Sequence, residues 1–206
     1  MMENEKNIEL KFMLKPDWVS WESVKDCLVS AHEYNRKRGF NMYHSTLSAQ
    51  KLADYLKDGY CFVALNGDRV VATCSLKVLT SQNWWAKGKR IAYTCLDGTA
   101  PKYKGTEAYF GLRELRNNHI KELGLRIMQF DTHEENQLVQ KLNLKRKFKY
   151  VRYCAFPMTD YYSVVMVKWL DGCPYSERYI NFRYRLSKFL TRLFFKPGRK
   201  LRFRFW

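Results

Sequence analysis

A basic, glycine-containing segment near the middle of the chain, Pro101-Lys-Tyr-Lys-Gly105, has the composition of an anion-binding loop. It stands between a β-prone run, 91–96, and a helical pattern over 107–123 in which apolar residues recur at three- and four-residue steps. Free N–H groups at the start of such a helix attract phosphate, and Lys102 and Lys104 add positive charge beside them. An ordinary strand–turn–helix connection has the same form, and the segment alone favours that simpler interpretation.

The size and charge of the chain narrow the classes of partner. A length of 206 residues favours one domain with an appendage, and an apolar content of 46% excludes global disorder. The formal net charge of +17 favours an anionic partner, either a nucleic acid, a membrane surface or a phosphorylated small molecule. Much of this charge lies in 175–206, which has ten basic residues and one acid. We therefore predict a folded domain over 1–172 and a basic tail over 173–206.

The cysteine pattern argues against both a metal site and a disulfide framework. The six cysteines are Cys27, Cys61, Cys74, Cys95, Cys154 and Cys173. None belongs to a C-x-x-C pair, and most lie within apolar runs, so we expect buried reduced thiols and no metal. The N-terminus lacks the form of a signal peptide, and no run of eighteen apolar residues is present. A cytoplasmic protein is expected.

Periodicity and turn residues predict alternating helices and strands. Strands are predicted over 7–14, 60–65, 69–79, 91–96, 125–130, 150–156 and 163–169. Helices are predicted over 18–38, 47–56, 107–123 and around 138–142, the last beginning at a capping box formed by Thr132 and Glu135. Asn66-Gly67 between two strands is a strong hairpin signal. The pair Trp84-Trp85 in the polar link 81–90 indicates either a membrane or substrate contact or a flap folded on the core.

This order of elements resembles the GNAT acyltransferase superfamily over residues 8–170. The segment 101–105 is similar to the P-x-Y-[RK]-G segment of that family, and Leu112 matches its helix leucine. Asn136, followed by a short helix and Phe148, is similar to a second family segment. The resemblance implies an α/β (α+β) fold with a mixed, mostly antiparallel central sheet flanked by helices. It also implies that the fourth and fifth strands are parallel and splayed, because a helix connects them.

The phosphate-binding pattern of the family, R/Q-x-x-G-x-G/A, is divergent here. With Lys104 at its first position, Glu107 and Tyr109 stand where the small residues belong. Asn143 stands where the family commonly carries a tyrosine that acts as general acid, so the acid is unassigned. A carboxylate at Glu107 would repel phosphate, although an acid at a helix N-terminus also stabilises the helix.

The resemblance implies direct transfer of an acyl group from acyl-CoA to an amine, with backbone N–H groups polarising the thioester carbonyl. The coenzyme A moiety would contact Leu96, Lys102, Lys104, Gly105, Thr106 and Asn136. The candidates for the base that deprotonates the amine are Asp97, Asp131, His133 and Tyr153. Asp97 is also a turn former, Asp131 and His133 are also candidates for a helix cap, and Tyr153 is a core candidate. We take His133 and Tyr153 as the pair to test first.

The resemblance and its departures from the family pattern leave three classes of function open. The first is an acyltransferase, with acetyl as the expected group and a small-molecule or lipid-linked amine as acceptor. The second keeps the fold but uses another donor, such as an aminoacyl or acyl-carrier thioester. The third is a non-catalytic basic module that binds anionic lipid or nucleic acid. A homodimer is compatible with each class.

The tail carries an amphipathic helical pattern. Its apolar stripe comprises Tyr179, Phe182, Leu186, Phe189, Leu190 and Leu193, and a basic stripe that includes Arg178, Arg185 and Arg192 lies beside it. Such helices lie in the headgroup layer of anionic membranes, which predicts a peripheral protein at the inner membrane face. The alternative is that the apolar stripe docks on the domain or on a second subunit. Nucleic acid ranks third, because base stacking suits an exposed aromatic platform.

Overall fold

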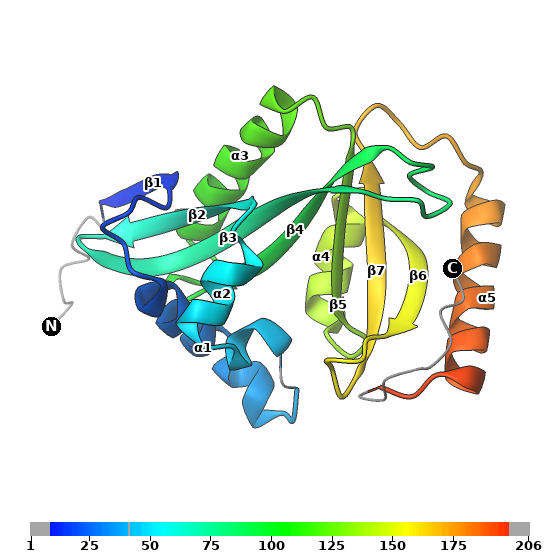
Figure 1. The fold of residues 1–206 in the computed structure, drawn as a ribbon, viewed down its shortest axis with the longest axis horizontal. Helices are drawn as coiled ribbons and strands as arrows, with labels where there is room; N and C mark the ends of the chain where they lie inside the picture. Colours follow the sequence, from blue (N-terminus) through cyan, green and yellow to red (C-terminus); the bar gives the residue numbers. More distant parts are fainter. Residues whose placement is uncertain (1–8, 41, 198–206) are drawn as a thin grey trace, which may run out of the picture. The chain divides into compact units, whose positions relative to one another are not determined.

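The computed structural model describes residues 9–40 and 42–197, and it contains a seven-stranded sheet in the order β1-β2-β3-β4-β5-β7-β6 (Figure 1). The strands are β1 (Leu10–Leu14), β2 (Gly59–Asn66), β3 (Arg69–Thr80), β4 (Arg90–Thr99), β5 (Ile127–His133), β6 (Lys149–Ala155) and β7 (Tyr162–Trp169). The helices are α1 (Trp21–Lys37), α2 (Ala49–Tyr55), α3 (Glu107–Glu122), α4 (Gln137–Lys145) and α5 (Glu177–Phe194). The mixed, mostly antiparallel sheet flanked by helices confirms the predicted fold class.

The strand pairings follow the local sequence signals. β2 and β3 form the antiparallel hairpin predicted by Asn66-Gly67, with Gly67 at a positive φ of 57°. β4 and β5 are parallel neighbours, with Ala92 paired to Met128 and Tyr93 to Gln129. A parallel pair needs a long crossover, and α3 provides it. The parallel arrangement is therefore confirmed, and the splaying of the two strands beyond Tyr93 stays a prediction.

The chain forms two compact units. The first comprises the described residues up to Lys77 together with Thr94–Gly124, and the second comprises Val78–Tyr93 and the described residues from Leu125 on. Tail residues 173–197 thus belong to the second unit, where they supply α5. Residues 198–206, the rest of the predicted tail, lie outside the described part of the chain.

In the first unit, helices cover both faces of the strands at very close range (Figure 1). A Cβ atom on Gly98 of β4 would lie 3.1 Å from side-chain atoms of both Leu28 and Ala31 on α1. A Cβ atom on Gly111 of α3 would lie 2.7 Å from the ring of Phe12 on β1. A side chain at Gly111 would force the Phe12 ring to move, and one at Gly98 would push on Leu28 and Ala31, so glycine at these positions lets α1 and α3 lie close to the strands.

In the second unit, α5 runs along the outer edge of β6 (Figure 1). The backbone N–H of Tyr153 donates to Ser187 Oγ at 2.9 Å, and the hydroxyl of Thr191 donates to the Tyr153 carbonyl oxygen at 2.8 Å. Edge strands carry unpaired backbone groups that attract other strands. Two hydroxyl side chains of α5 therefore take the place of a further strand beside Tyr153.

The Trp84-Trp85 pair folds onto the core of the second unit. Trp85 is buried, and its indole N–H donates to Gln129 Oε1 at 3.0 Å. Trp84 packs edge-on against Tyr175, whose hydroxyl donates to the Trp84 carbonyl oxygen. Of the two interpretations drawn from the sequence, the flap folded on the core is confirmed, because both rings have partners inside this unit.

The predicted capping box at Thr132 is wrong. Thr132 belongs to β5, and α4 begins only at Gln137, with Asn136 at the N-cap position. The Asn136 amide donates to Thr132 Oγ1 at 3.2 Å, so the hydroxyl expected to cap the helix binds a side chain instead. The strand continues further than its apolar pattern because Thr132 pairs with Val164 of β7.

Candidate functional site

Strand β4 contains one residue of unusual backbone conformation, Leu96, which the sequence placed in the acyl-CoA site. Leu96 has a φ of 52°, in the left-handed region, although it lies inside a strand and is buried. A leucine in this conformation costs on the order of 1–3 kcal/mol and persists only where the surroundings impose it. Local backbone irregularities of this kind in strands are over-represented next to active sites.

The loop after β4 ends in a well-formed helix start. A 3-10 turn over Pro101–Tyr103 is followed by Gly105 at a φ of 81° and by Thr106, the N-cap residue of α3. The Thr106 side chain accepts the N–H of Ala108 at 3.2 Å. Among the described residues, the N–H groups of Gly105 and Glu107 have no protein acceptor. They are thus available to an anion at the positive end of the helix.

The two lysines of the loop differ in their surroundings. Both are exposed, but the ammonium group of Lys104 donates to the carbonyl oxygen of Ala31 on α1 at 3.3 Å. Lys104 also lies near His32, whose pKa is lowered to about 4, chiefly by burial and further by the lysine charge. The positive charge of Lys104 therefore lies between the loop and α1, beside an uncharged imidazole.

The divergent residues of the phosphate-binding pattern lie on the first two turns of α3. Glu107 is exposed at the first helical position, and Tyr109 is half-buried with the guanidinium of Arg113 over its ring at 6.0 Å. Nothing lies within 4 Å of the Cβ position of Gly105. The loop is therefore open on its Gly105 side, and the Glu107 carboxylate extends from the same helix turn.

Asp97, a candidate base, is bound to a buried arginine of α3. The Arg116 guanidinium donates to Asp97 Oδ1 at 2.6 Å, and the arginine side chain is only 4% exposed. A buried guanidinium needs a carboxylate partner, because removing one member of such a pair leaves an uncompensated charge. The geometry thus gives Asp97 a role in holding α3 to β4. The turn predicted at Asp97 is wrong, because β4 continues through this residue to Thr99.

Asp131 in the second unit is also occupied by a neighbour. The Tyr93 hydroxyl donates to Asp131 Oδ1 at 2.5 Å, and burial raises the pKa of this carboxyl group above its usual value. Tyr93 lies on β4 and Asp131 on β5, so the bond connects the parallel pair by their side chains. A buried carboxyl group with a raised pKa is a recognised property of catalytic acids and bases.

His133 lies at the end of β5 with one ring nitrogen engaged. Its Nδ1 accepts the N–H of Glu135 at 3.0 Å, and its ring packs against Tyr161 with centroids 4.4 Å apart. Burial lowers the pKa of His133, which favours the neutral imidazole. A neutral ring whose Nδ1 accepts a hydrogen bond carries its proton on Nε2. His133 in this arrangement presents a donor, and it would need the other tautomer to act as a base.

Tyr153 belongs to a cluster that the sequence reasoning missed. Its buried hydroxyl donates to Glu134 Oε2 at 2.6 Å, and Arg192 of α5 donates to the same carboxylate oxygen at 3.1 Å. Burial, followed by the bond to Glu134, raises the pKa of Tyr153. In the sequence, Glu134 lies inside the predicted capping box, and Arg192 belongs to the basic stripe of the tail. The only feature of the sequence that could have pointed to Glu134 is its position next to the candidate base His133.

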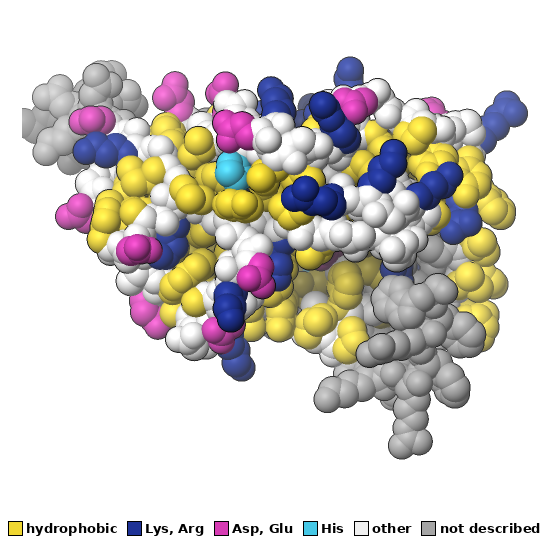
Figure 2. Space-filling view, turned by 45° about the horizontal axis from the view of Figure 1, so that its top comes forward, with side chains coloured by type: hydrophobic (Ala, Val, Ile, Leu, Met, Phe, Trp, Pro, Cys, Tyr) yellow, Lys and Arg dark blue, Asp and Glu magenta, His cyan; other side chains and the backbone are white. Residues whose placement is uncertain are grey.

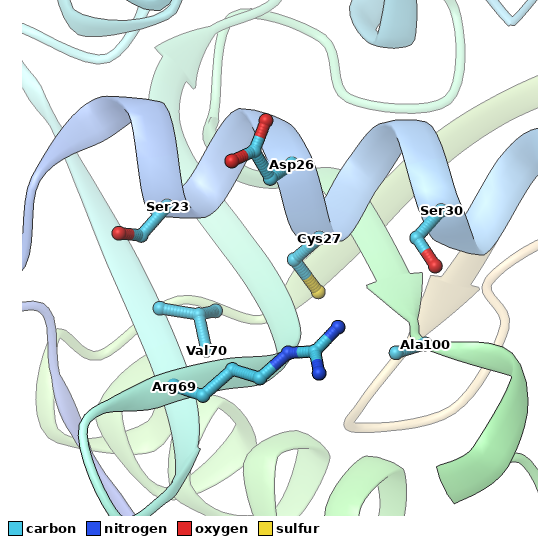
Figure 3. A pocket seen from close by; sticks show the side chains of 7 residues that line it. All are labelled: Ser23, Asp26, Cys27, Ser30, Arg69, Val70 and Ala100. Carbon is cyan, nitrogen blue, oxygen red and sulfur yellow. The ribbon is translucent and has the colours of Figure 1, made fainter.

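A small polar pocket lies in the first unit between α1, the start of β3 and the end of β4 (Figure 3). It encloses about 170 Å³, whereas sites for organic ligands usually measure ~300–1,000 Å³. The guanidinium of Arg69 extends toward Ala100 and the Cys27 thiol, and the Asp26 carboxylate points away from it (Figure 3). The pocket is too small for coenzyme A. No metal-binding group of three or more His, Cys, Asp or Glu occurs among the described residues.

The sequence matches no protein-family model and no curated protein. Solved structures do match. Arabidopsis thaliana NAA60 in complex with acetyl-CoA has a TM-score of 0.62 and 11% identity, covering 80% of this chain and 100% of that one. A GNAT family acetyltransferase from Elizabethkingia anophelis with acetyl-CoA bound has a TM-score of 0.56 and 11% identity, covering 80% and 100%.

A third structure extends the likeness over more of the chain. FeeM, an N-acyl amino acid synthase from uncultured soil microbes, has a TM-score of 0.60 and 11% identity, covering 88% of this chain and 98% of that chain. At these identities the likeness concerns the course of the backbone. The strand order, the parallel pair β4 and β5, and the crossover helix α3 are thus those of the GNAT acetyltransferase fold.

Proposed function

We propose that this protein is an acyltransferase that moves an acyl group, with acetyl as the first candidate, from acyl-CoA to an amine. The proposal rests on two neighbouring backbone features of the first unit, one in β4 and one in the loop that follows it. Leu96 has a left-handed conformation inside β4, and the open loop 101–106 with the start of α3 then presents the N–H groups of Gly105 and Glu107. Acetyl-CoA bound to two proteins of the same fold supports the choice of donor.

The loop 101–106 and strand β4 each have a role in this reaction. The pyrophosphate of the donor would accept hydrogen bonds from the loop N–H groups, with Lys102 and Lys104 supplying charge. Backbone N–H groups beside Leu96 would polarise the thioester carbonyl and stabilise the oxyanion that forms when the amine attacks. The attacking nitrogen must lose a proton to a base, for which Asp97, Asp131, His133 and Tyr153 stay the candidates, with Glu134 added by its bond to Tyr153.

The experiment is calorimetric titration of the full chain with coenzyme A at modest salt. We expect saturable binding at one site, with adenosine triphosphate as a matched polyanion that binds more weakly because it lacks the pantetheine arm. Equal affinity for both ligands would show that the basic surface binds polyphosphates without selecting coenzyme A. If titration with coenzyme A gives no binding heat, the proposal is overturned.

A second donor class is favoured by the side chains on the first two turns of α3. Glu107 and Tyr109 occupy positions where the pattern of the family requires small residues, and a carboxylate beside the pyrophosphate opposes its binding. An aminoacyl or acyl-carrier thioester would avoid that contact. Turnover of an acyl-carrier-protein thioester without turnover of the matching acyl-CoA would establish this alternative. A non-catalytic module would turn over neither donor.

A further inference from the structure

Helix α5 meets the second unit through its narrow polar side. Its buried residues are Ile180 and Thr191, and Ser187, on the same side, is half-buried. Ser187 and Thr191 bond the backbone of Tyr153, and Arg192 bonds Glu134. Tyr184 stacks on Tyr150, and Tyr179 packs edge-on against Trp84. The helix is therefore docked through these contacts, with Ile180 and Thr191 as its buried residues.

The apolar stripe of α5 lies on the opposite side and is open to solvent. Phe182, Phe189 and Leu193 are 60–64% exposed, and Leu186 between them is 40% exposed. Tyr179 and Leu190 widen this stripe, and Phe194 adds to it at the end of the helix. Side chains at steps of three and four residues form one continuous helix face, and apolar patches of this kind mark interaction surfaces. Figure 2 shows yellow side chains along the edge where α5 lies.

Positive charge borders the stripe. Arg178, Arg185 and Arg192 follow one another at seven-residue steps, which place them in a row beside Phe182 and Phe189. Arg178 and Arg185 are exposed, and within the described residues neither lies in ion-pair distance of a carboxylate. The only acid of the helix, Glu177, is already paired with Lys149. Arg192, the third member of the row, pairs with Glu134. The open face of α5 is thus an apolar stripe bordered by Arg178 and Arg185, cations that are unpaired in the described part of the chain.

We infer that this face of α5 lies in the headgroup layer of an anionic membrane. The apolar stripe would enter the boundary of the acyl chains, and Arg178 and Arg185 would contact lipid phosphates. The helix is amphipathic and does not cross the bilayer: among the described residues, no helix is long and apolar enough to span it. Docking through Ser187 and Thr191 keeps the stripe facing outward, so the helix binds lipid without leaving β6.

Charge decides between this partner and a second copy of the chain. A symmetric dimer through the stripe would bring the arginine rows of two identical helices to one interface. Like charges there would repel, and Glu177 cannot compensate them because it pairs with Lys149. Anionic lipid supplies an apolar layer for the apolar stripe and negative charge for the arginines beside it. Nucleic acid supplies the charge without the apolar layer.

The test is cosedimentation of the full chain with vesicles of phosphatidylcholine alone and with vesicles of equal parts phosphatidylcholine and phosphatidylglycerol. We expect binding to the anionic vesicles and little to the neutral ones. The double variant Arg178→Gln with Arg185→Gln should weaken anionic-vesicle binding on the order of 30-fold, because each juxtamembrane cation contributes about one kcal/mol. The double variant Phe182→Gln with Phe189→Gln should also weaken it, by more than about tenfold.

Matched controls come from α4, in the same unit. Lys141 and Lys145 are exposed cations and Leu138 and Leu142 are exposed apolar residues of that helix. Lys141→Gln with Lys145→Gln, and Leu138→Gln with Leu142→Gln, change charge and apolar surface by similar amounts and should bind vesicles like the parent chain. Circular dichroism establishes that every variant is folded.

Three outcomes would overturn the inference. One is equal binding to neutral and anionic vesicles, or equal loss in the α4 controls. Another is a concentration-dependent dimer in sedimentation velocity that the Phe182 and Phe189 substitutions abolish while vesicle binding is absent. The third is binding of a single-stranded oligonucleotide that depends on the α5 residues in the absence of vesicle binding. Because coenzyme A titration does not involve α5, its failure would leave this inference untouched.

Discussion

The ammonium group of Lys104 lies 3.3 Å from the carbonyl oxygen of Ala31, at the junction of α1 and the β4–α3 loop. If the loop holds a pyrophosphate, Lys104→Glu should weaken coenzyme A binding more than about tenfold, because a charge-assisted contact becomes a repulsion. Calorimetric titration measures the change, with Lys51→Glu on the exposed surface of α2 as the control for net charge. An unchanged dissociation constant for Lys104→Glu would show that the loop does not bind phosphate.

Glu107 is exposed at the first helical position, where a carboxylate interacts favourably with the helix dipole. Glu107→Gly should lower the free energy of unfolding by no more than about 1–2 kcal/mol, since it removes this interaction and adds a flexible residue. Coenzyme A affinity should stay the same or rise, because a charge that repels phosphate is lost. A collapse of affinity in a folded variant would instead assign Glu107 to the site.

His32 and His44 are both half-buried, and the pKa of each is lowered to about 4, mainly by desolvation. An unfolded chain binds protons at these residues below about pH 6.5, whereas the folded chain does not, so stability falls as pH decreases through that window. Between about pH 7 and about pH 5 the loss should be on the order of 2 kcal/mol for each histidine. In urea unfolding, each of the variants His32→Gln and His44→Gln should lose less free energy of unfolding than the parent chain over this pH range, and the difference should equal the contribution of one histidine. A loss as large as in the parent chain would place the acid sensitivity elsewhere.

Residue types alone indicated where charge and titratable groups would gather, but not which of them would pair. Asp97 was identified as a candidate, and its partner Arg116 was not, because nineteen positions separate them and only the packing of α3 on β4 brings them together. Arg192 and Glu134 are separated still further. Lys104 and Gly105 could be identified as candidates for phosphate binding because the residues of an anion-binding loop are adjacent in the sequence.

At the scale of elements, the seam between α5 and β6 depends on two hydroxyls. Ser187→Ala or Thr191→Val should each lower the free energy of unfolding by about 1–3 kcal/mol, because a backbone group of Tyr153 loses its partner. Ser163→Ala is the matched control in the same unit. Its hydroxyl is fully buried and has no hydrogen-bond partner among the described residues, so its removal should cost little. Chemical denaturation compares the three variants; equal costs would show that volume matters here and hydrogen bonds do not.

The helices and strands themselves were largely predictable, because burial of one face gives each a period that the sequence displays. β2, β3 and α3 follow their patterns to within a few residues. The start of α4 was not predictable in this way. Thr132 and Glu135 have the residue types of a cap, and only pairing with β7 extends β5 through Thr132 and displaces the helix. The open stripe of α5 could not be predicted either, since periodicity does not show which face docks.

At the scale of the whole molecule, one thiol differs from the others. Cys173 is exposed, and the other five cysteines are buried, with the pKa of Cys27 and of Cys154 each raised to about 12 by desolvation. The thiolate is the reactive form, so a disulfide reagent should modify one thiol in the native protein and six after denaturation. Absorbance of the released thiolate counts them, and Cys173→Ser should leave none reactive in the native state. Rapid modification of several thiols would mean that the folded units unfold locally and expose their buried cysteines.

Closure of the sheet edge by α5 has a consequence for synthesis on the ribosome. α5 follows every described strand in the sequence, so it is translated after β6 and β7 have both emerged. Until then the Tyr153 backbone groups face outward without Ser187 and Thr191, and the nascent chain carries an open strand edge. A premature stop codon between Gly172 and Ser187 would make that state permanent. Such a product should form insoluble aggregates or be held by chaperones, even though every strand of the sheet is present.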